Sequence, residues 1–166
     1  LVAEADESDG SFLKLSPILA VVTNIDHEHL DHYKTFDKVL DAFTEFINRV
    51  PFYGAALLCL DDPYVQRILP TVRRRTVTYG ESAQADLRVT NMRPASISSE
   101  FQLTLRGQDL GCFRLNVPGI HNVLNATAAV GIALELEIPV ETIRAGVQTY
   151  SGVDRRMQVR GEAGGA

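Results

Sequence analysis

The segment NIDHEHLDHY, residues 24–33, gathers three of the four histidines of the chain and three acids. Its spacing fits the pattern H-x-H-x-D-H of two-metal hydrolases, so His27, His29, Asp31 and His32 raise the hypothesis of a dizinc site. Two zinc ions need further histidine and aspartate ligands downstream, and His121 is the one remaining histidine. The number of possible ligands therefore argues against a dizinc hydrolase, which remains an alternative.

A second group of acids follows the first apolar residues, in LVAEADESD. The runs LVAEA and ILAVVTNI are typical of strands buried on both faces. Ligands of open α/β sheets bind at the carboxyl ends of strands. Two neighbouring strands would therefore bring the acids Glu4, Asp6 and Glu7 beside His27, His29 and Asp31. Carboxylates and an imidazole suit a hydrated divalent cation. The alternative is that these charges are helix caps and solvated loop residues.

The segment PGIHNVLNATAAVGIAL predicts a turn followed by a helix that starts at His121 or Asn122. Asn122 and Asn125 are three residues apart and so share one helix face. An asparagine amide both donates to and accepts from the edge of adenine. Small residues within 126–131 would let this helix pack closely on a sheet. Each asparagine alone could be a simple cap or turn residue, but the grouping indicates a nucleotide site.

Two arginine groups differ in their surroundings. Arg155 and Arg156, in GVDRRMQV, lie between a turn and a possible last strand, where a guanidinium could bind a triphosphate through paired hydrogen bonds. The run Arg73–Arg75 separates a helix from the middle of the chain, and we expect it to be a solvated stretch.

The elements that must position these residues follow an α/β order. A helix is expected over 36–49 with Thr35 as its cap, a buried strand in AALLCL, and a short helix in DDPYVQRIL. This order favours a mostly parallel, doubly wound sheet flanked by helices. Residues 76–118 alternate between apolar and polar and predict a small antiparallel meander with one solvated face. Two helices follow, in HNVLNATAAVGIALEL and VETIRAGVQTY.

Composition sets the class of protein. At 166 residues and 18.3 kDa, with 45% hydrophobic residues, the chain suits one α/β domain with a real core. A net charge of -5 argues against general nucleic-acid binding, and no apolar stretch reaches membrane-spanning length. Cys59 and Cys112 lie in apolar runs, which predicts buried, reduced thiols and a cytoplasmic location. The closing GEAGGA, residues 161–166, predicts a hinge, so we expect a piece of a larger protein.

Taken together and in this order, EADESDGSF, VTNIDHEHLDHY, PFYG with LDDP, PGIHNVLNA and GVDRRMQV resemble the central domain of the Mur ligases. The resemblance implies a P-loop-type fold that binds ATP and Mg²⁺. It places Glu4 and His29 at the magnesium ions and Arg156 at the phosphates. His121, Asn122 and Asn125 match the positions that hold adenine. His27 and His32 have no counterpart, and only Thr44 or Glu45 lies near the place of the carbamylated lysine of several relatives, so that role is not assigned.

The resemblance also implies an activity in peptidoglycan synthesis. ATP would phosphorylate the lactyl carboxylate of UDP-N-acetylmuramate, and L-alanine would attack the acyl phosphate to form an amide. Residues 1–160 would be the central domain and residues 161–166 the hinge toward a C-terminal domain. Because the chain has no Gly-Lys dipeptide, the P-loop and its strand are expected upstream, and the isolated chain is predicted not to ligate. A non-catalytic nucleotide-binding module is the second alternative.

Overall fold

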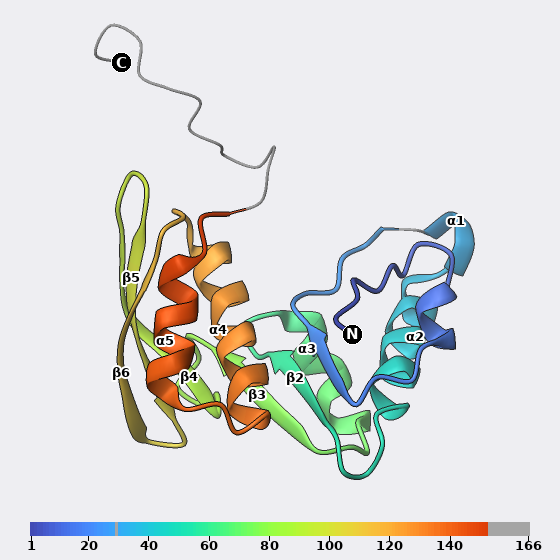
Figure 1. Cartoon of the computed structure of the whole chain (residues 1–166). Coiled ribbons are helices and arrows are strands. Elements are labelled where there is room, and N and C mark those ends of the chain that lie inside the picture. The colour runs from blue at the N-terminus through green and yellow to red at the C-terminus, as the bar shows by residue number, and fades with distance from the viewer. Residues whose placement is uncertain (29, 153–166) are drawn as a thin grey trace, which may run out of the picture.

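Six strands form one sheet in the order in which they occur along the chain (Figure 1). The structure, a computed structural model, describes residues 1–28 and 30–152. The strands are β1 Leu19–Val22, β2 Ala55–Cys59, β3 Thr76–Gly80, β4 Leu87–Pro94, β5 Ser99–Leu105 and β6 Gln108–Leu115. The helices are η1 Ser11–Lys14, α1 Leu30–Tyr33, α2 Phe36–Asn48, α3 Pro63–Ile68, η2 Leu69–Thr71, α4 Ile120–Glu135 and α5 Val140–Thr149. Within the described ranges, no helix combines the length and the apolar character needed to cross a membrane.

Strands β1 and β2 run parallel, as the alternation of strands and helices predicts, and β3 and β4 continue the parallel pairing. Helix α2 begins where expected, because the Thr35 hydroxyl accepts the hydrogen bond of the Lys38 backbone N–H. Helix α3 begins at a proline, and the Asp62 carboxylate before it accepts from two backbone N–H groups of the first turn. All five residues of β2 are buried, as expected for a strand covered on both faces.

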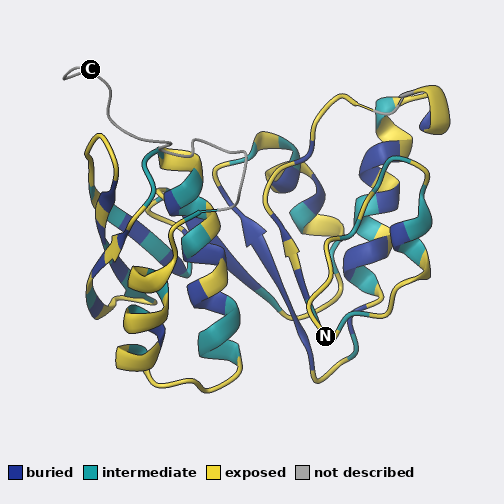
Figure 2. Ribbon diagram, turned by 45° about the horizontal axis from the view of Figure 1, so that its top comes forward, coloured by how far each residue is buried: buried dark blue, intermediate teal, exposed yellow. Residues whose placement is uncertain are grey.

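Helices cover both faces of the sheet, and β2 contributes to a separate core on each face (Figure 2). Ala56 and Leu58 pack with α2 and α3, whereas Leu57 and Cys59 pack with α4 on the other face. Helix α4 approaches closely: a Cβ atom built on Gly131 would lie 2.4 Å from a methyl carbon of Leu57. The prediction that small residues bring this helix close to the sheet is confirmed.

Three expectations about the fold are wrong. The run LVAEA is no strand, because residues 1–7 have no regular secondary structure and Leu1 and Val2 are fully exposed. A run of three apolar residues becomes a strand only beside a pairing partner, and no described strand pairs with it. Cys59 is buried as expected, but Cys112 is exposed. Side chains alternate along β6, and Phe113 takes the buried face.

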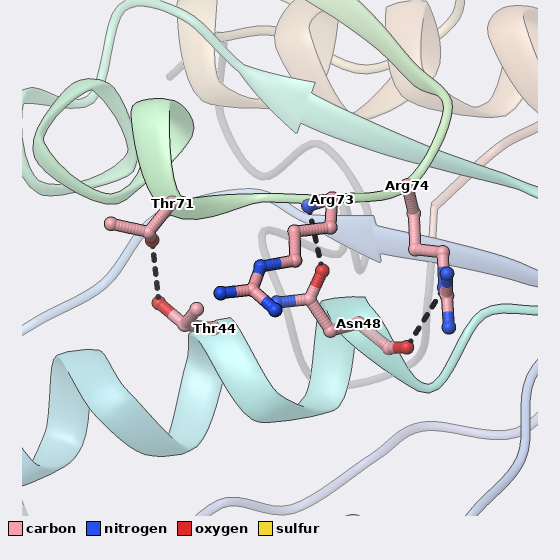
Figure 3. Close-up of a pocket in the computed structure, with 5 residues that line it drawn as sticks. All are labelled: Thr44, Asn48, Thr71, Arg73 and Arg74. Atoms are coloured by element: carbon pink, nitrogen blue, oxygen red, sulfur yellow. Dashed lines mark hydrogen bonds between the residues drawn. The ribbon is translucent and has the colours of Figure 1, made fainter.

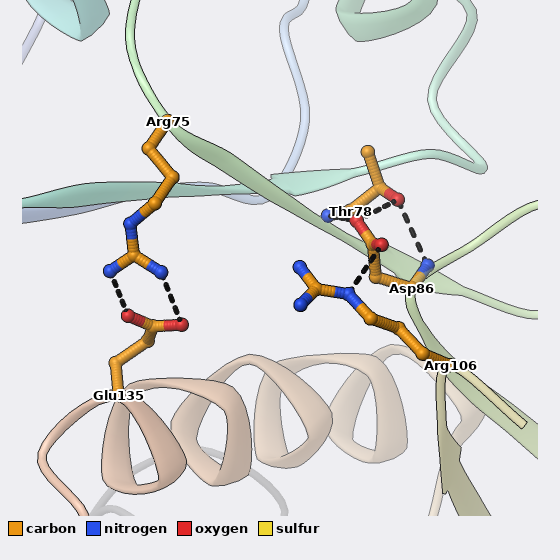
Figure 4. Close-up of polar contacts among 5 residues, drawn as sticks. All are labelled: Arg75, Thr78, Asp86, Arg106 and Glu135. Carbon is orange, nitrogen blue, oxygen red and sulfur yellow. Dashed lines mark hydrogen bonds and ion pairs between the residues drawn. The ribbon is translucent and has the colours of Figure 1, made fainter. Parts of the chain in front are cut away.

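The third wrong expectation concerns β3, which was expected to open the antiparallel meander. β3 pairs in parallel with β2 and β4, and only β4, β5 and β6 form the meander. Its Thr78 suggests a solvated face but is buried, because the Asp86 carboxylate accepts from both its backbone N–H at 2.9 Å and its hydroxyl at 3.0 Å (Figure 4). The same carboxylate accepts from Nε of Arg106 at 3.0 Å.

We expect Asp86→Ala to lower the free energy of unfolding at neutral pH by about 1–3 kcal/mol, because the buried Thr78 N–H loses its acceptor. Burial by itself raises the pKa of Asp86, but hydrogen bonds from Thr78 and Arg106 outweigh it and hold the pKa below its ordinary value. The carboxylate therefore stabilises the fold above the unfolded-state pKa of about 3.9, and this contribution is lost as pH falls through the folded-state pKa.

Urea unfolding at neutral pH and near pH 2.5 checks this expectation, and the gap between wild type and Asp86→Ala should narrow at the lower pH. Asp37→Ala is the matched control, because its carboxylate pairs with Arg67 on the exposed surface and should contribute little. An equal gap at both pH values would contradict the assignment.

Candidate functional site

The C-terminal end of β6, the first turns of α4 and the C-terminal end of α5 enclose a pocket of about 560 Å³. This volume lies in the range of small-molecule sites. The pocket contains all three residues that the sequence assigned to adenine. The lining residues are Leu115, Val117, Pro118, His121, Asn122, Asn125, Ala126, Ala129, Gly146, Val147, Tyr150 and Gly152.

The start of α4 sets the directions of these side chains. Gly119 caps the helix with a positive φ of 104°, and a Cβ atom there would lie 2.8 Å from the imidazole of His121. Glycine is therefore required for the ring to lie across the turn. The Asn122 side-chain amide donates to the carbonyl oxygen of Pro118 at 2.7 Å. One of its two N–H groups is therefore already hydrogen-bonded within the turn. Asn125 is exposed, and no hydrogen bond to another described residue occupies its amide.

Polar contacts from α5 hold the far wall of the pocket in place. Arg144 donates from Nε to the carbonyl oxygen of Cys112 at 3.0 Å, and its guanidinium carbon lies 5.1 Å from the ring centre of Phe113. The Asn116 amide donates to the carbonyl oxygen of Gln148 at 2.7 Å. These contacts fix α5 against β6, and so they set the width of the pocket.

The lining suits a flat, largely apolar ring with a polar edge. Small side chains of α4 leave room over the helix, and Val117 and Val147 offer apolar contact. The Asn125 amide provides a donor and an acceptor at the rim, the pair of groups that adenine presents in return. Val117, Val147 and Tyr150 also line this pocket, and the sequence motifs did not point to them. Val117 directly precedes the turn that opens α4, whereas Val147 and Tyr150 come from α5 and its C-cap and reach α4 only through the packing of α5.

In the described part of the chain, the exposed histidines of this segment contact aromatic side chains. The His27 ring stacks on Phe36 with ring centres 3.5 Å apart and lies 2.9 Å from the Tyr64 hydroxyl in a hydrogen bond. His32 lies edge-on to Tyr33. Residues 1–28 and 30–152 contain no group of three or more His, Cys, Asp or Glu side chains placed to hold a metal ion. The dizinc alternative therefore gains no support.

The acidic turn near the N-terminus does lie beside this segment, although LVAEA forms no strand. The Tyr33 hydroxyl donates to the carbonyl oxygen of Glu7 at 2.6 Å. Burial, together with the carboxylates of Glu7, Asp9 and Asp6, raises the pKa of Tyr33. The Ser11 hydroxyl and backbone N–H lower the pKa of Asp9 through hydrogen bonds.

Two of the residues assigned to ions and phosphates lie outside the described residues. These two residues are His29 and Arg156. The possible last strand and the hinge expected at 161–166 also lie outside the described residues. Glu4 is exposed in the N-terminal segment without regular structure. The described residues therefore bring His121, Asn122 and Asn125 into one pocket, whereas Glu4 is the one proposed magnesium ligand among them.

Comparisons with known proteins identify the family of this chain. The Mur ligase middle domain is the family whose sequence model matches residues 2–133. The UDP-N-acetylmuramate–L-alanine ligase of Solibacter usitatus is 59% identical over 165 residues, which are 99% of this chain and 35% of that protein. The chain thus spans about a third of the length of the curated relatives it matches.

Solved structures show the same fold. The UDP-N-acetylmuramate–alanine ligase of Thermotoga maritima has a TM-score of 0.82 at 21% identity, covering 96% of this chain and 35% of that chain. A MurF ligase of Thermotoga maritima in complex with ADP has a TM-score of 0.72 at 20% identity, covering 93% and 36%.

Proposed function

Because this chain belongs to the Mur ligase family as a middle domain, we propose that it binds ATP for an enzyme that joins L-alanine to UDP-N-acetylmuramate. The observation that carries the proposal is the pocket at the start of α4, where His121, Asn122 and Asn125 line one wall. Asn125 would hold the adenine edge, and Val117 and Val147 would contact its faces. The bacterial cytoplasm, where ATP and the nucleotide sugar are available, is the proposed location.

The proposed reaction forms an amide in two steps. The lactyl carboxylate takes the γ-phosphoryl group of ATP and releases ADP. The amine of L-alanine then attacks the acyl phosphate, phosphate leaves, and the lost amine proton passes to the medium. Phosphoryl transfer depends on positioning and on neutralised charge around the transferred group. The part assigned to this chain is to bind one end of ATP rigidly, so that its phosphates extend toward the rest of the enzyme.

We assign Mg²⁺ to Glu4 and His29, and the phosphates to Arg156, on the sequence motifs that carry these residues. Bound magnesium would neutralise phosphate charge. Glu4 offers a carboxylate of the right chemistry, but the described residues place it in no group of three or more His, Cys, Asp or Glu side chains that could hold the ion. Loss of Mg²⁺-dependent nucleotide affinity in a Glu4→Gln variant of the full-length ligase would support this assignment, and unchanged affinity would remove it.

The part of the enzyme that cradles the phosphates is proposed to come from outside these 166 residues. The sequence contains no Gly-Lys dipeptide, which a P-loop requires. Among the described strands, β1 pairs with β2 alone, and its other edge is open. Val21 of β1 and Ile18 before it are partly exposed at 38% and 57%. An additional strand beside β1 would pair this edge. Residues 1–160 would then form most of the central domain, and residues 161–166 its hinge.

We expect Asn125→Ala in the full-length ligase to raise the Kd for ADP about tenfold, because one amide supplies both hydrogen bonds to the adenine edge. Isothermal titration with Mg²⁺ present measures the effect. Asn91→Gly is the matched control: it also removes an exposed amide, it lies outside the pocket, and its φ of 51° suits glycine. An unchanged Kd in Asn125→Ala would reject the adenine assignment.

The isolated chain should bind ADP weakly and show no alanine-dependent ATP turnover, because it lacks the phosphate loop. ATP turnover by the isolated chain would reject the proposal that the phosphate loop lies outside these 166 residues. Weak binding that Asn125→Ala abolishes would show that the nucleotide pocket forms without the rest of the enzyme.

A further inference from the structure

A second pocket, of about 440 Å³, lies between the C-terminal half of α2 and the segment that joins η2 to β3 (Figure 3). Thr44, Asn48, Thr71, Arg73 and Arg74 line it. Helix α2 covers one face of the sheet and α4 the other, so this pocket is separate from the nucleotide pocket. The sequence predicts a solvated stretch for its arginines, but the backbone N–H of Arg73 and the side chain of Arg74 both bond to Asn48.

The orientation of the Asn48 amide follows from its partner. Oδ1 of Asn48 accepts the backbone N–H of Arg73 at 2.8 Å, and an N–H can bond only to an acceptor. The Nδ2 group must therefore be the other end of the amide. In the described part of the chain no acceptor takes its two N–H groups. Asn48 thus presents two available donors.

The hydroxyl groups of Thr44 and Thr71 differ in which of them has a proton to donate into the pocket. The Thr71 hydroxyl donates its single proton to the carbonyl oxygen of Ile68 at 2.7 Å. Thr44 must therefore be the donor in the long contact of 3.4 Å between the two hydroxyl oxygens. At that length the contact is weak, so an oxygen atom of a ligand could replace Thr71 as the acceptor of the Thr44 proton.

The charges at the pocket are positive. Nε of Arg74 donates to the backbone carbonyl oxygen of Asn48 at 3.0 Å. The two terminal nitrogens of the Arg74 guanidinium therefore remain available to a ligand. The Arg73 guanidinium lies between the threonine pair and Asn48 (Figure 3), and within residues 1–28 and 30–152 it has no ion pair or hydrogen bond. No carboxylate lines the pocket. Glu45, next to Thr44 in the sequence, is paired with Arg49 at 2.7 Å.

We propose that this pocket binds the phosphate group of a small molecule. The Arg73 guanidinium lies beside the amide of Asn48 and the hydroxyl of Thr44, and Arg74 adds a second positive charge on the other side of Asn48 (Figure 3). No described lining side chain offers a carboxylate against them. Arginine binds phosphate through paired, charge-assisted hydrogen bonds. This site is independent of the adenine pocket and of the proposed ligase reaction.

The test is a titration of the 166-residue chain with inorganic pyrophosphate at constant ionic strength, followed by the NMR signals of arginine Nε–H and asparagine side-chain amides. We expect saturable shifts of Arg73 Nε–H and Asn48 Nδ2. Arg73→Ala should raise the Kd about tenfold or more, because it removes charge-assisted hydrogen bonds. Arg73 has no side-chain partner in the described residues to lose, so the variant should fold normally.

Thr44→Val, which keeps the shape and removes the hydroxyl donor, should weaken binding a few-fold. Arg93→Ala is the matched control, because Arg93 is likewise exposed and lies outside the pocket. Arg93→Ala should leave the Kd for pyrophosphate within about twofold of the wild-type value if specific contacts in the pocket, and not the overall charge of the chain, determine binding. Shifts that do not saturate, shifts confined to the start of α4, or equal effects of Arg73→Ala and Arg93→Ala would each overturn the proposal.

Discussion

Gly54→Ala is expected to lower the free energy of unfolding by about 3 kcal/mol or more, a large part of the stability of a domain of this size. A Cβ atom at this position would lie 2.1 Å from the backbone oxygen of Ile18 and 2.8 Å from a side-chain carbon of Val50. The first of these is main chain and cannot rotate away. The same Ile18 oxygen accepts the N–H of Ala55 at 3.2 Å, at the start of the β1–β2 pairing. The methyl group would therefore separate these two strands.

Urea unfolding followed by circular dichroism measures this loss as a lower midpoint at an unchanged slope. Gly146→Ala is the matched control, because the same chemical change meets nothing within 4 Å inside helix α5. There alanine should stabilise the chain by up to about 1 kcal/mol through helix propensity. Midpoints that move in the same direction in both variants would show that the close contact at Gly54 is unimportant.

Phe101→Ala is expected to cost about 3–5 kcal/mol, the range of large-to-small changes in a packed core. Phe101 is 1% exposed and stacks on Phe113, with ring centres 5.9 Å apart. Phe113 in turn lies under the guanidinium of Arg144 on α5. Loss of the Phe101 ring would therefore loosen the meander and also the wall that α5 forms in the proposed nucleotide pocket.

Phe52→Ala provides the comparison for this variant, since Phe52 is 88% exposed and its removal should change stability by no more than about 0.5 kcal/mol. Thermal and urea unfolding of both variants distinguish the two positions. Similar losses in the two variants would mean that the Phe101–Phe113 stack is not part of the cooperative core.

The part of the fold from β1 to α3 is predictable from sequence because its signals are local. Thr35 and the Asp62–Pro63 pair mark helix starts, and the apolar run of β2 indicates burial on both faces. The failures arise where a residue depends on a distant partner. Thr78 looks solvent-facing until Asp86 satisfies its hydrogen bonds. The apolar start of LVAEA indicates a strand but contains no information about which strand would pair with it.

The candidate site divides in the same way. His121, Asn122 and Asn125 could be found because one helical turn carries all three. Val147 and Tyr150 could not, because the docking of α5 through Arg144 is a tertiary event. The histidine spacing shows the opposite risk. His27 matches a metal motif, yet its ring stacks on Phe36 and bonds to Tyr64.

The order of the strands has a consequence for how this chain is made. Every strand from β2 to β6 pairs with the strand that precedes it in the sequence. When a strand leaves the ribosome, its neighbour is already present, so the sheet can grow by one strand at a time without waiting for a distant segment. Short sequence separation between partners favours rapid folding, and growth from the first strand onward suits the direction of translation.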